Sequence, residues 1–213
     1  MDASVATMIN MITTMALPFL FAITVPVIVQ AYVADRMGDV TPRLEGRLSA
    51  DPLRHVDPFG TVLMPLLSVV MQFPILLGWP KALNVNPGNF RHPQAMKIYA
   101  LCGFLALLML ALIMGILLKW TLPMTGGQGW LFENLKNGML ICCVFAVLKM
   151  LPIPPNDGAL FIAQFLPPKH AESYFSVAPY GFFIFLAVIL FFKEIIFVPA
   201  ISIYIALLTL LGA

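Results

Sequence analysis

Charged residues are scarce in this chain. Asp, Glu, Lys and Arg make up 10% of its 213 residues, whereas apolar residues make up 61% and the mean hydropathy is +0.94. That composition leaves too little polar surface to cover a water-soluble domain of this size. The net charge of +2, without a basic patch interleaved with aromatic residues, argues against a nucleic-acid-binding protein. The sequence therefore predicts an all-α integral membrane protein.

Cysteine is also rare, and Cys102, Cys142 and Cys143 all fall inside apolar runs. A thiol in such surroundings behaves as a small hydrophobic group and meets no oxidising aqueous phase. We therefore expect three reduced core residues, which excludes a fold that depends on disulfides.

Five apolar runs set the predicted membrane topology, because a bilayer core needs about 20 apolar residues per helix. The runs cover residues 5–33, 59–77, 98–118, 135–151 and 180–212. The last run is too long for one untilted span, and a break is expected near residues 193–199, where Lys193 and Glu194 precede Pro199. We therefore predict a single polytopic domain, residues 1–213, with five or six transmembrane helices.

Two polar segments interrupt the apolar runs. Residues 34–58 connect the first two runs, and the alternation around residues 40–49, bounded by Gly and Pro, favours a small interfacial hairpin or sheet. Residues 78–97 are rich in Pro, Asn and Arg and lack helical periodicity. Both segments are expected at the membrane surface.

The string LPIPPNDG, residues 151–158, places one carboxylate, Asp157, in a Pro-rich break between apolar segments. An acid in a membrane segment needs a partner or a function. Asp157 could be a vestigial metal ligand, an acceptor for backbone N–H groups freed by the break, or the partner of Lys149. We favour the backbone acceptor, because the segment that should supply further ligands, PVIVQ at residues 26–30, contains no His, Cys, Asp or Glu.

Five strings, taken in order, resemble the short bacterial members of the site-2 protease family, which are intramembrane zinc metalloproteases. They are AYVADRMGD at residues 31–39, GRLSADPLRHVDPFGT at 46–61, GWPKALNVNPGNFR at 78–91, LPIPPNDG at 151–158 and APYGF at 178–182. The resemblance implies the site-2 protease core and a location in the bacterial inner membrane.

The resemblance also shows where this chain departs from the family. In the family, a His-Glu-x-x-His segment directly precedes the first string. In that alignment Pro26 and Gln30 stand at the two His positions, and Val27 stands at the Glu position. Two His at i and i+4 share a helix face and bind one zinc, and the Glu acts as the base. Proline offers no donor atom, valine cannot take a proton, and an amide is a poor zinc ligand. Asp157 is then the retained zinc-ligand position.

Further positions complete the predicted site. The resemblance implies that Leu107 replaces an Asn that helps to hold substrate or the oxyanion, and that Lys149 replaces another Asn. His55, with Asp57 two residues later, could act as a metal ligand or a base, but we favour an interfacial structural residue bonded to a nearby loop. Asn86 belongs to the Asn-Pro of the third string. Together with Asp157, these polar residues are predicted to line or support a groove.

These observations predict a pseudoprotease rather than an enzyme, with no metal or other cofactor. Its groove is expected to bind transmembrane helices of partner proteins, so that the chain acts as a scaffold or accessory subunit of a hetero-oligomeric complex surrounded by lipid. The alternative is an active intramembrane zinc metalloprotease whose metal site is rearranged around Asp157, His55 or a partner's residues. A small transporter or channel is disfavoured by the lack of detectable inverted repeats and the scarcity of polar residues within the spans.

Overall fold

The computed structural model describes residues 3–71, 73 and 76–212, and within them it contains helices and turns but no strand. Five stretches are long and apolar enough to cross a membrane: Val5–Arg36, Ala95–Thr125, Trp130–Met150, Pro168–Phe191 and Lys193–Leu211. The prediction of an all-α membrane protein is thus confirmed. Residues 72, 74 and 75, which belong to the run predicted at 59–77, lie outside the described residues.

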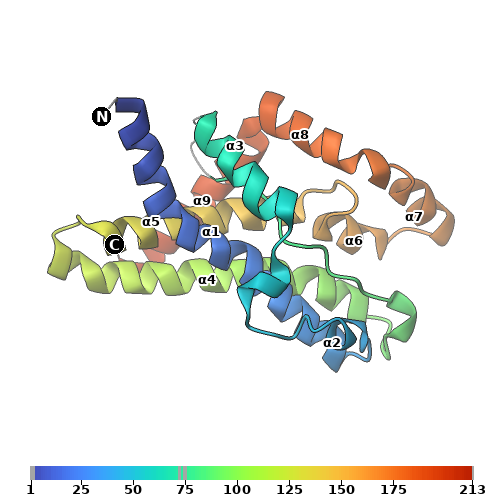
Figure 1. The fold of residues 1–213 in the computed structure, drawn as a ribbon. Coiled ribbons are helices and arrows are strands. Elements are labelled where there is room, and N and C mark those ends of the chain that lie inside the picture. Colours follow the sequence, from blue (N-terminus) through green and yellow to red (C-terminus); the bar gives the residue numbers. More distant parts are fainter. Residues whose placement is uncertain (1–2, 72, 74–75, 213) are drawn as a thin grey trace.

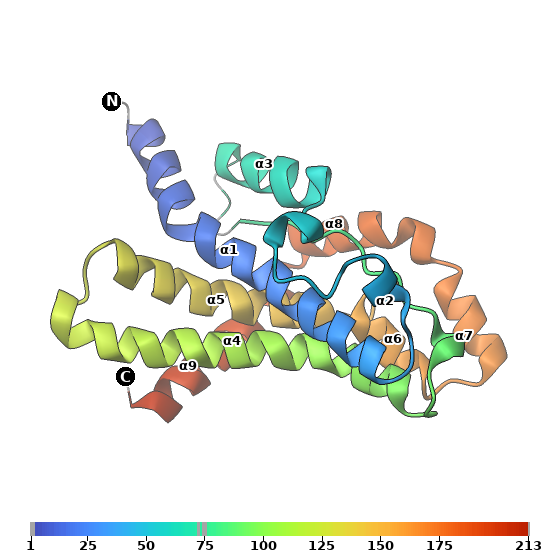
Figure 2. The same ribbon diagram turned by 60° about the horizontal axis from the view of Figure 1, so that its bottom comes forward.

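Three long helices form the centre of the molecule. Helices α4 (Ala95–Thr125) and α5 (Trp130–Met150) run side by side, and α1 (Ala3–Arg36) crosses them with its N-terminal end projecting from the body (Figures 1 and 2). Helix α5 is apolar around most of its circumference, and 56% of its spanning window is buried inside the chain. A helix that is apolar all round belongs in the core of a helical protein, where its neighbours cover every face.

The last two helices are covered by the rest of the chain far less than α5 is. Helix α8 (Gly181–Phe191) buries only Gly181 among its described residues, and α9 (Lys193–Leu211) packs on α5 through Ile196 and Ala200. Phe192 separates the two helices, immediately before the break predicted near residues 193–199. The single-domain interpretation and the predicted span limits stay predictions.

The first polar segment folds into helical turns. It contains α2 (Thr41–Leu44) and η1 (Pro52–His55), followed by η2 (Pro58–Leu63) and α3 (Met64–Val70). The strands expected around residues 40–49 are absent from this described segment, so that part of the prediction is wrong. Pro42 starts α2, where the φ fixed by its ring suits a first helical turn, and Gly46 follows its end at φ +68°. The sequence thus carries a helix start and stop instead of a hairpin.

The remaining short elements precede α4 or follow α5 in the chain. They are η3 (Pro87–Asn89), α6 (Asp157–Ala163), α7 (Pro168–Phe175) and η4 (Ala178–Tyr180). Gly158 lets α6 fold back over the end of α5, because a Cβ at this position would lie 2.2 Å from the Met150 carbonyl oxygen. This return of the chain brings Asp157 next to the last turn of α5.

Candidate functional site

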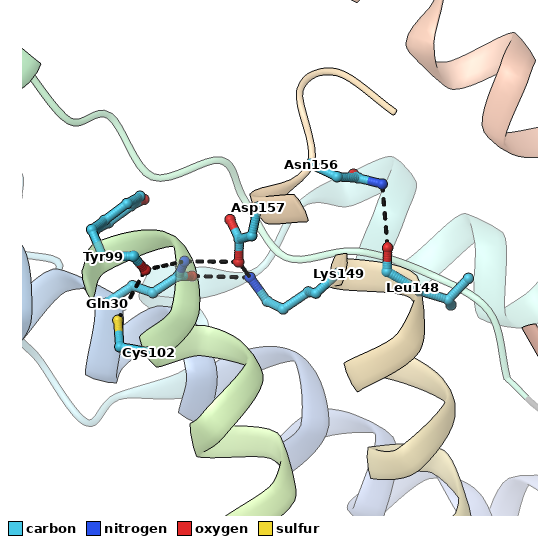
Figure 3. A network of polar contacts seen from close by, with 7 residues as sticks. All are labelled: Gln30, Tyr99, Cys102, Leu148, Lys149, Asn156 and Asp157. Atoms are coloured by element: carbon cyan, nitrogen blue, oxygen red, sulfur yellow. Dashed lines mark hydrogen bonds and ion pairs between the residues drawn. The ribbon is translucent and has the colours of Figure 1, made fainter. Parts of the chain in front are cut away.

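Three side chains from three helices meet where the Pro-rich break returns over α5 (Figure 3). Gln30 comes from α1, Lys149 from the last turn of α5 and Asp157 from the start of α6. The Lys149 Nζ atom lies 2.5 Å from Asp157 Oδ2 and 3.0 Å from Gln30 Oε1. The Gln30 Nε2 atom lies 2.9 Å from the same Asp157 oxygen. We call these three residues the polar triangle.

Each side of the polar triangle joins a donor to an acceptor. The ammonium of Lys149 donates to both neighbours, and the amide of Gln30 accepts from Lys149 and donates to Asp157. Gln30 is 2% exposed and Asp157 is 8% exposed, so an unpaired charge here would be costly. A closed arrangement of this polarity satisfies the buried groups and neutralises the carboxylate.

The ion pair replaces the interpretation of Asp157 that we favoured from the sequence. In the described part of the chain, no backbone N–H donates to the Asp157 carboxylate. Lys149 reaches it instead, because Asn156 and Gly158 hold the chain against the end of α5: the Asn156 side chain donates to the Leu148 carbonyl at 3.3 Å. The seven residues between Lys149 and Asp157 therefore form a tight return.

Helix α4 comes very close to the polar triangle at Gly103. A Cβ added there would lie 2.8 Å from Gln30 Cδ and 3.0 Å from Asp157 Oδ2, closer than van der Waals contact. Leu107, one turn further along α4, is fully buried in the apolar core. The absence of a side chain at position 103 thus lets α4 pack over the triangle.

The residues present do not fit the zinc ion that the resemblance implies. Among the positions that the register aligns with ligands, Asp157 gives one carboxylate and Gln30 one amide, while Pro26 contributes no donor atom. The Lys149 ammonium already donates hydrogen bonds to Gln30 and Asp157, the two side chains whose oxygens could bind a metal. The described residues contain no group of three or more His, Cys, Asp or Glu placed to hold a metal. That no cofactor is bound stays a prediction.

His55, Asp57 and Asn86 lie outside the polar triangle and organise the polar segments. His55 is fully buried, and its Nε2 atom lies 2.9 Å from the Ser49 carbonyl oxygen; its structural role at the interface stays a prediction. Asp57 accepts from the backbone N–H of Gly60 at 2.6 Å and so starts η2. Asn86 caps η3 by accepting from the backbone N–H of Gly88 at 3.0 Å.

Asp39 is an organising residue that the sequence reasoning missed. It is fully buried and accepts from the Thr41 N–H and hydroxyl, from the Asn86 N–H and from the Asn89 side-chain amide, at 2.6–3.1 Å. Burial alone would raise the pKa of Asp39, but these hydrogen bonds outweigh it and lower the pKa below its ordinary value. The Asp-x-Thr pattern at residues 39–41 is typical of such a turn and could have indicated it.

Arg47 is the second residue that was missed. It is 2% exposed, and its guanidinium donates to the backbone carbonyls of Arg54, Lys81 and Ala82. Asp39 and Arg47 thereby join residues 34–58 to residues 78–97. The two polar segments are consequently joined into one surface unit.

Comparisons with known proteins give one informative similarity. The chain is similar to "Putative zinc metalloprotease YwhC" of Bacillus subtilis (strain 168). The two are 26% identical over 187 residues, which is 84% of this chain and 80% of YwhC. No family model and no solved structure matches the chain. The similarity supports a site-2-protease-like membrane protein.

This similarity corrects one prediction. The sequence led us to expect that the chain is not an enzyme, yet the protein that it resembles over most of its length is named as a metalloprotease. The replaced positions at Pro26, Val27 and Gln30 were the basis of that expectation. These three replacements concern the metal ligands at a single place in the molecule. They do not outweigh a similarity that extends over 84% of the chain.

Proposed function

We propose that this chain binds transmembrane helices of other membrane proteins, as an accessory subunit of a larger complex in the bacterial inner membrane. The observation that carries the proposal is the coverage of its last two spans. Only 11% of the spanning windows of residues 168–191 and of α9 is buried inside the chain, compared with 56% for α5. Apolar helices with so little internal contact offer whole faces to lipid or to neighbouring helices.

A cavity beside the polar triangle supports this proposal. It has a volume of about 170 Å³ and lies between α1, α5, residues 78–80 and α8. Pockets for small molecules usually measure about 300–1,000 Å³, so this one suits a side chain from a neighbouring helix better than a separate ligand. Phe185 of α8 lines the cavity, and Phe182 stacks edge-on against Trp79 at 5.6 Å. A helix packed on α8 would therefore reach the cavity directly.

Lys149 gives the cavity a polar end. Its ammonium has three N–H groups, two of which bond to Gln30 and Asp157. The third has no hydrogen-bond acceptor among the described residues, and Lys149 also lines the cavity. A backbone carbonyl at the C-terminal end of a partner helix is a suitable acceptor, because the helix dipole favours a cation there.

Site-specific photo-crosslinking in native membranes tests this proposal. A photoreactive residue at Phe183 of α8 or Val198 of α9, both well exposed, is expected to form an adduct with a defined membrane protein. Met109 of α4 is similarly exposed and is the matched control, at which no such adduct is expected. The proposal fails if positions 183 and 198 yield only lipid adducts, or the same products as position 109.

The similarity to YwhC favours a second candidate function, hydrolysis of peptide bonds within the membrane. This function would require further metal ligands besides Asp157, because positions 26, 27 and 30 supply no His or Glu. Elemental analysis of the purified protein separates the two candidates. Stoichiometric zinc that disappears in Asp157→Ala, together with cleavage of a membrane-spanning substrate, would favour hydrolysis over helix binding.

A further inference from the structure

A second cavity, with a volume of about 700 Å³, is partly lined by α6 and does not include Lys149 or Asp157 in its lining. Its walls come from the segment around η3, the start of α4, α6 and α7. Met96, Leu160 and Phe175 give it apolar walls, while Arg91, His92 and Glu172 are its ionisable residues. The volume lies in the range that holds a separate small molecule, which is about 300–1,000 Å³.

Two of its basic side chains are free. The described residues supply neither a hydrogen-bond acceptor nor an ion-pair partner for the Arg91 guanidinium or the His92 ring. Lys97, close by on α4, adds a second positive charge to that of Arg91, with its ammonium 4.5 Å from the centre of the Phe165 ring. Glu172 is the single acid of the cavity lining, so positive charge is in excess there.

The position of this cavity in the bilayer follows from α4. This membrane-spanning helix begins at Ala95, shortly after Arg91 and His92, so those side chains lie near the end of a span. Phospholipid phosphates occupy this level, and anionic lipids attract Lys and Arg there. From Met96 onward the wall of the cavity belongs to an apolar helix, whose direction lipid tails can follow.

We propose that this cavity binds the headgroup of an anionic phospholipid. The phosphate lies between Arg91 and His92, and the acyl chains leave along Met96 and Leu160. A guanidinium is suited to this role because its N–H groups match two phosphate oxygens at once. Glu172 limits the affinity, because it faces the same space with a negative charge. The apolar walls favour a lipid over a free anion, which would gain nothing from them.

Native mass spectrometry of the full chain in a neutral detergent tests the proposal. Phosphatidylglycerol and phosphatidylcholine with identical acyl chains are added in parallel, and more phosphatidylglycerol is expected to stay bound. Arg91→Gln combined with His92→Gln is expected to lower its retention by about fivefold, as the loss of one interfacial cation predicts. Lys81→Gln is the matched control, because Lys81 is exposed in the same polar segment but does not line the cavity.

A gain-of-binding variant keeps the test decisive if the double variant folds poorly. Glu172→Gln removes the opposing charge and is expected to raise retention of phosphatidylglycerol by about two- to fivefold. Equal retention of the two lipids would overturn the proposal. So would an equal loss in Lys81→Gln, an unchanged value in Glu172→Gln, or displacement of the lipid by millimolar inorganic phosphate alone.

Discussion

Lys149 supplies the positive charge that Asp157 needs inside a membrane protein. The pair is partly shielded, with 22% of the Lys149 side chain and 11% of the Asp157 side chain exposed. Gln30 completes the arrangement from a distant part of the sequence, since its amide NH2 group donates to Asp157 and its carbonyl oxygen accepts from Lys149. At this scale the carboxylate is paired with a cation that the chain itself carries.

Removal of that cation should destabilise the protein. In Lys149→Met the carboxylate keeps only the Gln30 bond, so we expect a loss of about 1–3 kcal/mol, less than for a fully buried pair. Thermal unfolding in detergent measures it. Adding Asp157→Asn to the variant should recover part of the loss. Lys136→Met is the control, because its pair with Glu133 is exposed and worth at most about 1 kcal/mol; equal losses in the two Lys variants would contradict the prediction.

His55 should make stability depend on pH. Burial, aided by the charge of Arg47, lowers the pKa of His55 below its ordinary value of about 6.5, although the Ser49 bond opposes this shift. The unfolded chain therefore takes up a proton at a higher pH than the folded protein does. Stability should be full above about pH 6.5 and fall below it, by at most about 1.4 kcal/mol per pH unit.

Unfolding temperatures between pH 5 and 8 provide the measurement. His55→Gln keeps a donor for the Ser49 carbonyl and should reduce the dependence on pH. The exposed His170 serves as control, and His170→Gln should leave the dependence as it is. If His55→Gln showed the same loss of stability on acidification as the unmodified chain, the decrease would have to come from other groups.

At the scale of secondary-structure elements, the approach of α4 to α1 and α6 depends on one glycine. In Gly103→Ala the new methyl group would collide with Gln30 and Asp157, so we expect a loss of about 1–3 kcal/mol by overpacking. Gly115→Ala in the same helix is the control. Its methyl group would meet the flexible ends of Leu211 and Met139, which can move aside. A smaller loss at Gly103 than at Gly115 would count against a tight approach.

The sequence predicted some elements well because their signals are local. The run at residues 98–118 is uninterrupted and apolar, and it lies inside α4. The strands expected at residues 40–49 failed because apolar alternation over so few residues is a weak signal. Pro42 and Gly46, which bound α2, fit a short helix better. The helix start at Pro42 and the stop at Gly46 thus decided the local structure, and the apolar alternation did not.

The candidate site was only partly predictable for a different reason. Lys149 and Asp157 are eight residues apart, so their pairing could be proposed from the sequence. Gln30 lies 127 positions before Asp157 in the sequence. Its contact with Asp157 depends on how α1 crosses α5. Arg47 was overlooked because its acceptors are backbone carbonyls. Every residue type has a backbone carbonyl, so the sequence does not indicate which ones accept. Contacts between distant elements require the packed structure.

For the whole molecule, the cysteines should report global unfolding. Cys142 and Cys143 are fully buried in α5, and Cys102 is 9% exposed in α4. A maleimide reagent should label Cys142 and Cys143 at least about 10³-fold more slowly in the folded protein than in denaturant, because labelling waits for opening of the core. Mass spectrometry of tryptic peptides follows each thiol. Rapid labelling of Cys143 in folded protein would contradict the packing of α5 at the centre.

During synthesis, the surface unit can be completed only after the last hydrogen-bond partners of Asp39 have been added to the chain. Thr41 is available to Asp39 almost at once during synthesis, but Asn86 and Asn89 follow 47 and 50 residues later. At about 5–20 residues per second, a ribosome needs roughly 2–10 s to supply them. During that interval Asp39 must be solvated by water. The first polar segment consequently has to remain outside the bilayer core until the next one has emerged.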